Sequence, residues 1–471
     1  MALRVYNTDL KNISNQFLIR LDVNYRYFFD KLDAKVWNNS TIALRDIIQP
    51  ISSEKISKGE IDDEEYLVDL SNINRRLNTL TGVQLVSEIG SDKVILQNGD
   101  IIIPKIQPQM CNIFTNTQHY RLIASTELVE YKCSDNVNPK FLFYLLAMPH
   151  FSKCLSYSES GKTHRRVNPS ELLKYKIPSI CIKTQNQSIT KIEEIELKIS
   201  VLTSQLKAEQ EIINEILSRE FMFDINEIKK IDKQKYIGIS AQDLDVKNTN
   251  LRNSSRWYKL QLIEKVIFRN IKHYECLKNY LIGEGTKNGW SPECSEFEDQ
   301  TMVLGIDAIN TNGVLTFNNL KYTNQTKKNI NDFFIKENDF FISRGNTVDL
   351  VALASIARNI DNNEYIYPDL MIRITFDTTK INREYLAYIF NSVIGRMYFK
   401  YAAKGKQQTM VKVSSDEIKQ FLIPILDINE QERIVEEIKS EINKQNAIKI
   451  NIESLRLAID DIIENVLLNT K

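Results

Sequence analysis

Isoleucine and leucine recur at alternating intervals of three and four residues in two long stretches of the chain. Neither stretch contains proline or glycine, and this heptad spacing is typical of long helices that pair with another helix along a narrow apolar seam. We expect each helix to last about 35 residues, roughly 50 Å at about 1.5 Å per residue. The predicted helix-pairing seam consists of Ile192, Ile195, Ile199, Leu202, Leu206, Ile213, Ile216, Ile438, Ile448, Ile452, Leu455, Ile459 and Ile462.

Both stretches belong to a longer repeat. Residues 167–178 return in recognisable form as residues 413–424, at an offset of 424 − 178 = 246 residues. In each copy an Ile-Pro pair is followed by a glutamine, Gln185 or Gln431, and then by the isoleucine-rich stretch. A repeat of about half the chain predicts two similar domains, each followed by a similar helix.

Matched segments upstream of the Ile-Pro pair predict the elements of each domain. The pairs are 96–103 with 335–342, 127–131 with 369–373, and 141–146 with 385–390. The first pair places a polar turn before a β-branched and aromatic run, and the second pair has the same strand composition. The third pair predicts a short helix that begins near Asn138 or Asn382. Each half is therefore expected to be a mixed α/β globule of roughly 170 residues.

The two long helices are natural partners for each other. Each helix could instead pack on its own globule, but a seam of two positions in seven favours another helix of the same kind. The polar Gln445 within the second seam would help to fix the register. The sequence thus predicts an α+β fold in which two similar mixed α/β domains are separated and joined by two long antiparallel coiled-coil helices about a pseudo-twofold axis. A spacer of about 50 Å matches roughly one and a half turns of B-DNA.

Composition narrows the class of protein. Of the 471 residues, 61 are Lys or Arg and 61 are Asp or Glu, which argues against a protein coated in positive charge but allows a local basic groove. Six cysteines without CxxC spacing and only four histidines disfavour a zinc site. The N-terminal residues do not resemble a signal peptide, and no apolar run is long enough to cross a bilayer. We therefore expect a cytoplasmic location with no membrane contact.

The chain carries no recognisable catalytic motif. It lacks the Asp/Asn-Pro-Pro-Tyr/Phe signature of amino-methyltransferases and the carboxylate-x-Lys pattern of metal-dependent nucleases. Gly161-Lys162-Thr163 resembles the end of a phosphate-binding loop, but Ser156 stands where that loop requires its first glycine. We expect this chain not to be an enzyme.

Two loops at equivalent places in the repeat combine glycine, cations and side-chain hydrogen-bonding groups. Lysine and arginine can contact phosphates or guanine edges, and glutamine can bind adenine through two hydrogen bonds. A solvated basic loop is the alternative, and recurrence in both halves makes it less favoured. The candidate DNA-binding residues, including those that follow two matched strands, are Lys105, Lys162, His164, Arg165, Arg166, Arg344, Asn346, Lys404, Lys406, Gln407 and Gln408.

Over essentially its whole length, the chain resembles the specificity (S) subunit of Type I restriction–modification systems. The second copy carries the clearer motif, Ile423-Pro424-Ile425 followed by Glu430-Gln431-Glu432-Arg433-Ile434-Val435. Trp290-Ser291-Pro292 and Ser343-Arg344-Gly345 also look like this family's recognition-domain sequence. The first copy departs from the pattern, because Thr184-Gln185-Asn186-Gln187 contains no arginine and no good match to Trp-Ser-Pro is found.

The resemblance implies target-recognition domains at 1–183 and 252–429, conserved spacer helices at 184–222 and 430–471, and a polar linker at 223–251. Each recognition domain would read one half of an interrupted double-stranded DNA sequence. The helices would set the gap and bind two methyltransferase subunits, and restriction subunits would complete the complex. The resemblance implies no cofactor in this chain, because S-adenosylmethionine, ATP and magnesium would belong to the partners.

Two other functions fit the same residues. One is a specificity-type DNA-binding module that serves a different methyltransferase or nuclease partner. The other is a coiled-coil adaptor that binds proteins and never DNA.

Overall fold

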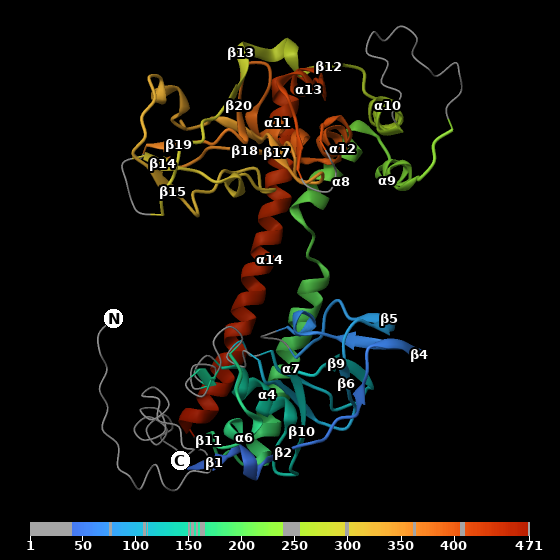
Figure 1. Ribbon diagram of the computed structural model, residues 1–471, viewed down its shortest axis with the longest axis vertical. Helices are drawn as coiled ribbons and strands as arrows, with labels where there is room; N and C mark the ends of the chain where they lie inside the picture. Colours follow the sequence, from blue (N-terminus) through green and yellow to red (C-terminus); the bar gives the residue numbers. More distant parts are fainter. Residues whose placement is uncertain are drawn as a thin grey trace. The chain divides into compact units, whose positions relative to one another are not determined.

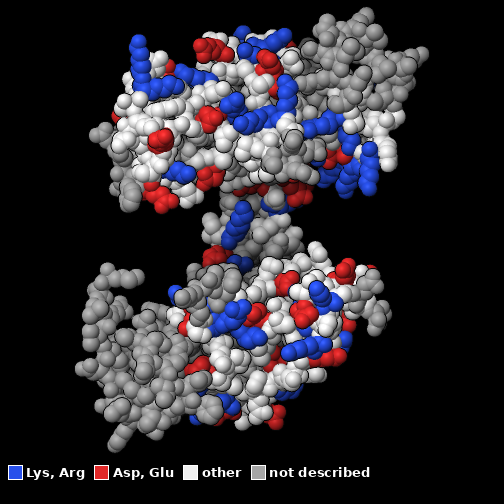
Figure 2. Space-filling model, in the orientation of Figure 1, with Lys and Arg blue, Asp and Glu red and all other residues white. Residues whose placement is uncertain are grey.

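The computed structural model describes residues 40–74, 78–106, 110, 112–148, 151, 155–156, 159–160, 165–238, 255–296, 301–360, 364–405 and 410–469. The chain divides into two compact units (Figure 1). Unit 1 combines Met1–Gln205 with Ile448–Lys471, and unit 2 is Leu206–Ala447. Lys and Arg are interspersed with Asp and Glu on the face of each unit shown in Figure 2, as the formal net charge of zero suggests.

Unit 1 contains two principal sheets. The four-stranded sheet has the order β2 (Ile48–Pro50), β10 (Leu128–Cys133), β7 (Ile101–Pro104), β8 (Phe114–Thr115). The five-stranded sheet has the order β3 (Lys55–Ile56), β6 (Lys93–Leu96), β9 (Leu122–Ser125), β4 (Gly59–Val68), β5 (Gln84–Ile89). A small sheet pairs β1 (Thr41–Ala43) with β11 (Lys176–Pro178), which contains the Ile-Pro of the first copy.

Unit 2 repeats the four-stranded sheet and has a smaller second sheet. Its four-stranded sheet has the order β13 (Leu281–Asn288), β20 (Met371–Phe376), β16 (Phe340–Ser343), β18 (Ala354–Ile356). A three-stranded sheet has the order β15 (Lys321–Thr323), β14 (Thr301–Val303), β19 (Tyr365–Ile366). Two small sheets pair β12 (Tyr274–Cys276) with β22 (Leu422–Pro424), and β17 (Gly345–Asn346) with β21 (Val411–Lys412).

The matched segments of the sequence occupy matched places in the two units. The predicted strand pairs are β7 with β16 and β10 with β20, and in each unit the two strands lie side by side and antiparallel. β4 with β9 and β14 with β19 are also equivalent parallel pairs. All four residues of β7 and of β16 are buried, so these strands form the centre of each core. The structure confirms the repeat that the sequence predicted.

Some helices also recur. Among the described residues, unit 1 contains α4 (Pro139–Ala147), α6 (Pro169–Leu172), α7 (Ile182–Ser204) and the end of the last long helix, while unit 2 contains α8 (Glu209–Phe221), α9 (Ile225–Lys233), α10 (Ser255–Phe268), α11 (Arg383–Asn391), α12 (Val393–Ala402) and α13 (Ser415–Gln420). Short 3-10 helices are η2 (Leu44–Asp46), η3 (Leu70–Asn72), η5 (Leu277–Tyr280), η6 (Ile306–Ala308) and η7 (Ile330–Phe333). Asn138 and Asn382 cap α4 and α11 through their side-chain oxygens, which confirms the predicted starts of these helices.

One prediction about the long helices is wrong. The sequence predicts a continuous first helix over 184–222, but α7 ends at Ser204 and α8 begins at Glu209. Within the break, the N–H of Lys207 donates to Oε1 of the buried Gln445 at 2.9 Å. Heptad spacing continues through the break because the pattern reflects which side chains face the seam. It does not show whether the backbone forms helical hydrogen bonds. The second helix, α14 (Ile428–Asn469), is continuous.

A second correction concerns the predicted linker at 223–251. Residues 225–233 of that stretch form α9, which Asp224 caps by accepting from the N–H of Asn226 at 2.8 Å. Ile228 is fully buried in the core of unit 2, so this part of the stretch packs as a helix rather than connecting two domains. Polar composition concealed it because only one face of so short a helix is buried.

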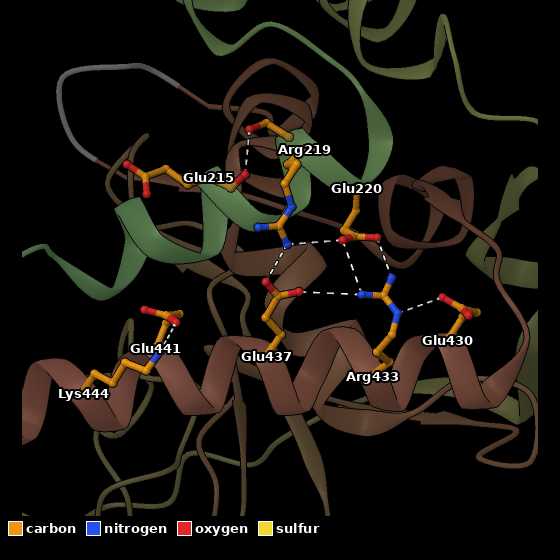
Figure 3. A network of polar contacts seen from close by, with 9 residues as sticks. Glu215, Arg219, Glu220, Glu430, Arg433, Glu437, Glu441 and Lys444 are labelled. Atoms are coloured by element: carbon orange, nitrogen blue, oxygen red, sulfur yellow. Dashed lines mark hydrogen bonds and ion pairs between the residues drawn. The ribbon is translucent and has the colours of Figure 1, made fainter.

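In unit 2, α8 runs antiparallel to the first half of α14. Lys207 contacts Gln445, Arg219 contacts Glu437, and Glu220 contacts Arg433, so residue numbers rise along one helix as they fall along the other. Figure 3 shows the ion-pair network at this junction, where both arginines bind carboxylates of the opposite helix.

Every residue of the predicted seam is buried or partly buried. Among the described residues, the structure contains no helix whose length and apolar character would let it span a bilayer.

Candidate nucleic-acid interface

The recurring glutamine fixes the start of each long helix to its globule. In unit 1, the side-chain amide of Gln185 donates to the carbonyls of Asn136 at 3.1 Å and Ile180 at 2.8 Å. Its Oε1 accepts from the N–H of Asn138 at 2.9 Å. The side chain therefore ties α7 to the turn that caps α4.

Gln431 makes the same three bonds in unit 2. Its amide donates to Lys380 O at 2.9 Å and Leu426 O at 2.8 Å, and its Oε1 accepts from the N–H of Asn382 at 2.8 Å. Gln185 is 4% exposed and Gln431 is 1% exposed, so each buried amide group depends on these bonds for its partners. The glutamine that marks the repeat in the sequence is thus the polar joint between the helix and the globule in each unit.

The two candidate loops are closed in the same way. In unit 1, Ser160 and Arg166 exchange two backbone hydrogen bonds of 2.9 Å each, and in unit 2 Lys404 and Lys412 exchange bonds of 2.9 and 2.8 Å. Gly405, just inside the second closure, has φ +138°, and a Cβ there would lie 2.8 Å from Met410 O, so the loop requires glycine at this position. The predicted residues Lys162, His164, Lys406, Gln407 and Gln408 lie outside the described residues.

Each closed loop is bound to the extension of a core strand. Val167, just past the first loop, donates to Lys105 O at 2.9 Å, and Val413, just past the second, donates to Arg344 O at 2.9 Å. Lys105 and Arg344 therefore occupy equivalent places in the two units. The structure therefore places Lys105 and Arg344, the candidates that follow matched strands, next to the candidate loop of their own unit.

Asn346 also reaches the second loop. Its backbone pairs with Val411 in the short β17–β21 ladder, so the segment after β16 and the end of the loop form one small sheet. The side-chain Oδ1 of Asn346 accepts from the N–H of Thr347 at 2.8 Å, and its amide nitrogen has no hydrogen-bond partner recorded among the described residues. Arg344, Asn346 and Lys404 thus lie on adjoining segments of unit 2.

In unit 1 the described loop cations already have acidic partners. Arg166 binds Glu127 through Nε and Nη2, with contacts of 2.9 to 3.2 Å, and these hydrogen bonds raise the pKa of Arg166 above its usual value. Arg165 lies 3.7 Å from Glu159. A phosphate at this loop would have to share the arginines with these carboxylates or displace the carboxylates. Arg166 also ties the loop to Glu127, the residue that precedes β10.

In unit 2, Lys404 compensates a buried carboxylate. Its Nζ lies 2.7 Å from Oε1 of Glu417, whose side chain is only 7% exposed. Burial raises the pKa of Glu417, but hydrogen bonds from Lys404 and Ser414 outweigh burial and leave the pKa below its usual value. Glu417 in turn caps α13 by accepting from the N–H of Ser414 at 2.9 Å. Lys404 therefore ties its loop to α13.

The equivalent carboxylate in unit 1 is neutralised differently. Glu171 is also buried, but its partner is Lys174 of the following turn, with Nζ 2.6 Å from Oε1. Arg344 of unit 2 makes a looser contact, 3.9 Å from a carboxylate oxygen of Asp369, and its Nη1 donates to the Asp369 carbonyl at 3.3 Å. The frames of the two units agree, while the ion pairs that position their loops do not.

Comparison with known proteins gives a fold. No protein-family model matches the chain, and no curated protein matches its sequence. Among solved structures, a chain from the work "Structural basis underlying complex assembly and conformational transition of the type I R-M system" is 13% identical with a TM-score of 0.50, over 92% of this chain and 97% of that one. The protein shares the fold of a type I restriction–modification component.

Two further solved structures are similar over most of their length. The HsdS subunit from Thermoanaerobacter tengcongensis is 14% identical with a TM-score of 0.37, over 92% of this chain and 97% of that one. The type I restriction-modification system S subunit from M. genitalium is 11% identical with a TM-score of 0.44, over 91% and 96%.

The sequence did not lead us to predict the two buried glutamates that lie beside the loops. Glu171 and Glu417 follow Asn168 and Ser414 by three residues, which is the spacing of a helix capping box. That spacing could have marked both as local anchors. Within the described ranges, no three His, Cys, Asp or Glu side chains gather as a metal site would require.

Proposed function

We propose that this chain is the non-catalytic DNA specificity subunit of a Type I restriction–modification complex. The observation that carries the proposal is a repeated frame with unlike loops. The two units share the order of their four-stranded sheets and the glutamine joint, yet their closed loops differ in length, sequence and ion pairing. Two equivalent supports that present different side chains suit the reading of two different half-sites. The shared type I fold supports the same conclusion.

In the proposed mechanism, each unit reads one half of an interrupted duplex sequence. Cations around the loops locate the duplex through its phosphates, and polar loop side chains contact base edges in the major groove. Lys105 and Arg344 are placed to act beside the loops because their backbone carbonyls accept from the residues that follow each loop. Arg166 and Lys404, already bound to carboxylates, serve first to hold their loops in position.

The long helices complete the proposal. We assign α7, α8 and α14 to a pseudo-twofold antiparallel spacer that sets the gap between the half-sites and binds two methyltransferase subunits. Restriction subunits would join that assembly. The methyltransferase would flip its target adenine out of the duplex, and S-adenosylmethionine, ATP and magnesium would serve the partners' chemistry.

Methylation mapping tests the function directly. Host DNA is compared with and without the gene for this chain, in cells that keep the partner methyltransferase. We expect a bipartite adenine-methylation motif to disappear when the chain is removed. Every such motif remaining intact would contradict the proposal. Purification of the tagged chain should recover an adenine methyltransferase; recovery of proteins without any DNA-modifying subunit would favour an adaptor.

Alanine substitutions in each loop test the assignment of the reading residues. Gln407→Ala with Gln408→Ala should alter the half of the methylated motif read by unit 2 and leave the other half unchanged. Lys162→Ala with His164→Ala is the matched experiment in unit 1. A motif that is unchanged by both pairs of substitutions, in complexes that still methylate, would reject the loops as the reading elements.

A further inference from the structure

The helices α9 and α10 form a rigid basic layer in unit 2. Their apolar faces enter its core, with Ile228, Leu260 and Ile263 at most 1% exposed. The Nζ of Lys259 on α10 donates to the carbonyl of Asp232 on α9 at 2.9 Å, which joins the two helices. Their outer faces are therefore fixed relative to each other and to unit 2.

Positive charge gathers on those outer faces. Residues 224–238 and 255–273 contain nine Lys or Arg and four Asp or Glu, a surplus of 9 − 4 = 5 in a chain whose formal net charge is zero. Figure 2 shows Lys and Arg side chains clustered over the α9 region of unit 2. Six exposed lysines have no ion pair among the described residues, and they are Lys229, Lys230, Lys233, Lys235, Lys265 and Lys272.

Two of the four acidic residues are used within the helix pair. Asp224 caps α9 by accepting from the N–H of Asn226 at 2.8 Å. Glu227 binds Arg269, the residue that follows α10, with Nη2 3.0 Å from its carboxylate. Neither carboxylate is placed to compensate the exposed lysines.

The other two acidic residues face inward. Asp232 binds Nζ of Lys400 at 2.8 Å and the hydroxyl of Tyr401 at 2.5 Å, both on α12. Glu264 is half-buried, and burial raises its pKa to about 7, which weakens it as a negative charge at neutral pH. The acidic side chains of these helices therefore have structural roles, whereas no described residue forms an ion pair with the six lysines.

The spacing of the cations also suits an external anion. Lys229 and Lys233 stand four residues apart on α9, while Lys265 lies on α10 and Arg269 directly follows its last residue. Like charges at this spacing repel each other on a helix, and a bound anion relieves the repulsion. Lys272 lies four residues past the end of α10, so the positive charge continues beyond the helix.

This basic layer adjoins the candidate loop of unit 2. Arg256 at the start of α10 donates through Nη2 to the carbonyls of Lys400 and Ala403 at the end of α12. Ala403 immediately precedes Lys404, whose backbone closes the loop. The helices and the loop thus share one anchoring point, and a ligand at the loop would lie near the lysines.

We propose that the exposed lysines of α9 and α10 contact the phosphate backbone of duplex DNA beside the bases that the 404–412 loop reads. This inference rests on the proposed function and adds a sequence-independent contact outside the reading loops. Duplex DNA presents regularly spaced phosphates, which match rows of compact ammonium groups on rigid helices. The contact contributes affinity and leaves the choice of bases to the loop.

Neutralising the α9 row tests the inference. The variant carries Lys229→Gln, Lys230→Gln and Lys233→Gln in the full-length chain, and the probe is a pool of random-sequence duplexes over a range of salt concentrations. Each lysine that meets a phosphate contributes about 0.9 to the slope of log affinity against log salt concentration. We expect the magnitude of this negative slope to decrease by about 3. The matched control, Lys191→Gln with Lys198→Gln and Lys449→Gln, removes the same charge from exposed helix positions of unit 1 and should leave the slope unchanged.

A charge-retaining variant separates charge from folding. Lys229→Arg with Lys230→Arg and Lys233→Arg should bind with the wild-type slope. A wild-type slope in the Gln variant, or an equal fall in the control, overturns the phosphate contact. If methylation mapping still depends on the chain in that case, the contact fails and the proposed function stands. If mapping shows no dependence while the Gln variant alone loses affinity, the contact stands and the specificity function fails.

Discussion

The two units contain the same frame and differ in how that frame positions its loop. Gln185 and Gln431 make the same three hydrogen bonds, and both loops end in a reciprocal backbone pair. The buried glutamate beside each loop has unlike partners, however: Lys174 lies on the adjacent turn in unit 1, whereas Lys404 comes from the loop itself in unit 2. Contacts that are the same in both units therefore maintain the shared fold, whereas contacts that differ between the units position each loop for its own task.

The largest expected effect tests whether the frames are equivalent. Ile192 on α7 and Ile438 on α14 occupy matching positions, 438 − 192 = 246 residues apart, and both are fully buried. Ile192→Ala and Ile438→Ala should each lower the free energy of unfolding by about 3 kcal/mol, because each leaves a cavity in a packed core. Denaturant unfolding with peptide-level hydrogen exchange would assign each loss to its unit.

The exposed Leu197 provides the control for that comparison, since Leu197→Ala removes a side chain of the same helix that is 68% exposed. It should cost less than about 0.5 kcal/mol. A loss at one isoleucine more than twice that at the other would show that the frames are not equivalent.

The glutamine joints should give the next largest loss. Gln185→Ala and Gln431→Ala each remove three hydrogen bonds of a buried side chain, so we expect a loss of about 2 to 3 kcal/mol in either unit. Gln445→Ala removes one recorded hydrogen bond, to Lys207, and should cost about 1 kcal/mol. Amide hydrogen exchange at Asn138 and Asn382 measures the loss at each joint. Unchanged protection at both sites would show that the glutamines do not hold the helices to the globules.

The lysine partners should distinguish the two units. Lys174→Met and Lys404→Met each remove a lysine that pairs with a buried glutamate, and each should cost about 1 kcal/mol after allowance for the exposure of the lysines. Faster amide exchange across residues 403–413 is expected for Lys404→Met, whereas Lys174→Met should leave residues 159–167 unchanged. Equal changes in amide exchange in the two loops would show that Lys404 does not hold its loop more firmly than Lys174 does.

The Lys404 effect should depend on pH. The folded state lowers the pKa of Glu417, so its ionised form stabilises the fold above the unfolded pKa of about 4.3, and that stabilisation is lost as pH falls through the folded value. The difference in unfolding free energy between wild type and Lys404→Met should therefore be full at pH 7 and shrink in acid below about pH 4. A difference that grows in acid would have the wrong sign.

The smallest effect concerns the network of Figure 3. Arg433 and Glu220 lie 2.5 Å apart, but the guanidinium is 47% exposed, so a double-mutant cycle with Arg433→Gln and Glu220→Gln should give a coupling of about 0.5 kcal/mol. The repeat places uncharged Gln187 where unit 2 has Arg433, so Gln187→Ala should have almost no effect. The coupling should fall in high salt, and a salt-independent value would indicate that packing dominates instead.

The sequence predicted the elements whose information is local. Polar turns followed by β-branched and aromatic runs identified β7 and β16, and matched apolar segments after Asn138 and Asn382 identified α4 and α11. The loop positions were also predicted, since they fall between matched elements. The break before α8 was not, because the N–H of Lys207 is satisfied by Gln445, 238 residues away.

The roles of the loop cations could not be predicted for a similar reason. Arg166 is bound by Glu127, 39 residues earlier, and no spacing rule joins them. The chain's repeat showed that residues 161–166 and 404–409 lie at equivalent places, but a partner's identity depends on which strands become neighbours. Only Glu171 and Glu417 carried a local signal, the capping spacing, that could have revealed one end of an ion pair.

The closure of each loop has a consequence for how the protein can change. Ser160 with Arg166, and Lys404 with Lys412, are joined by main-chain atoms, which every residue except proline supplies in full. Most substitutions between the closing residues therefore leave the anchorage intact, apart from those at Gly405, where positive φ demands glycine. Such loops can accumulate sequence variation at little cost in stability, so new recognition can arise by point mutation without a new fold.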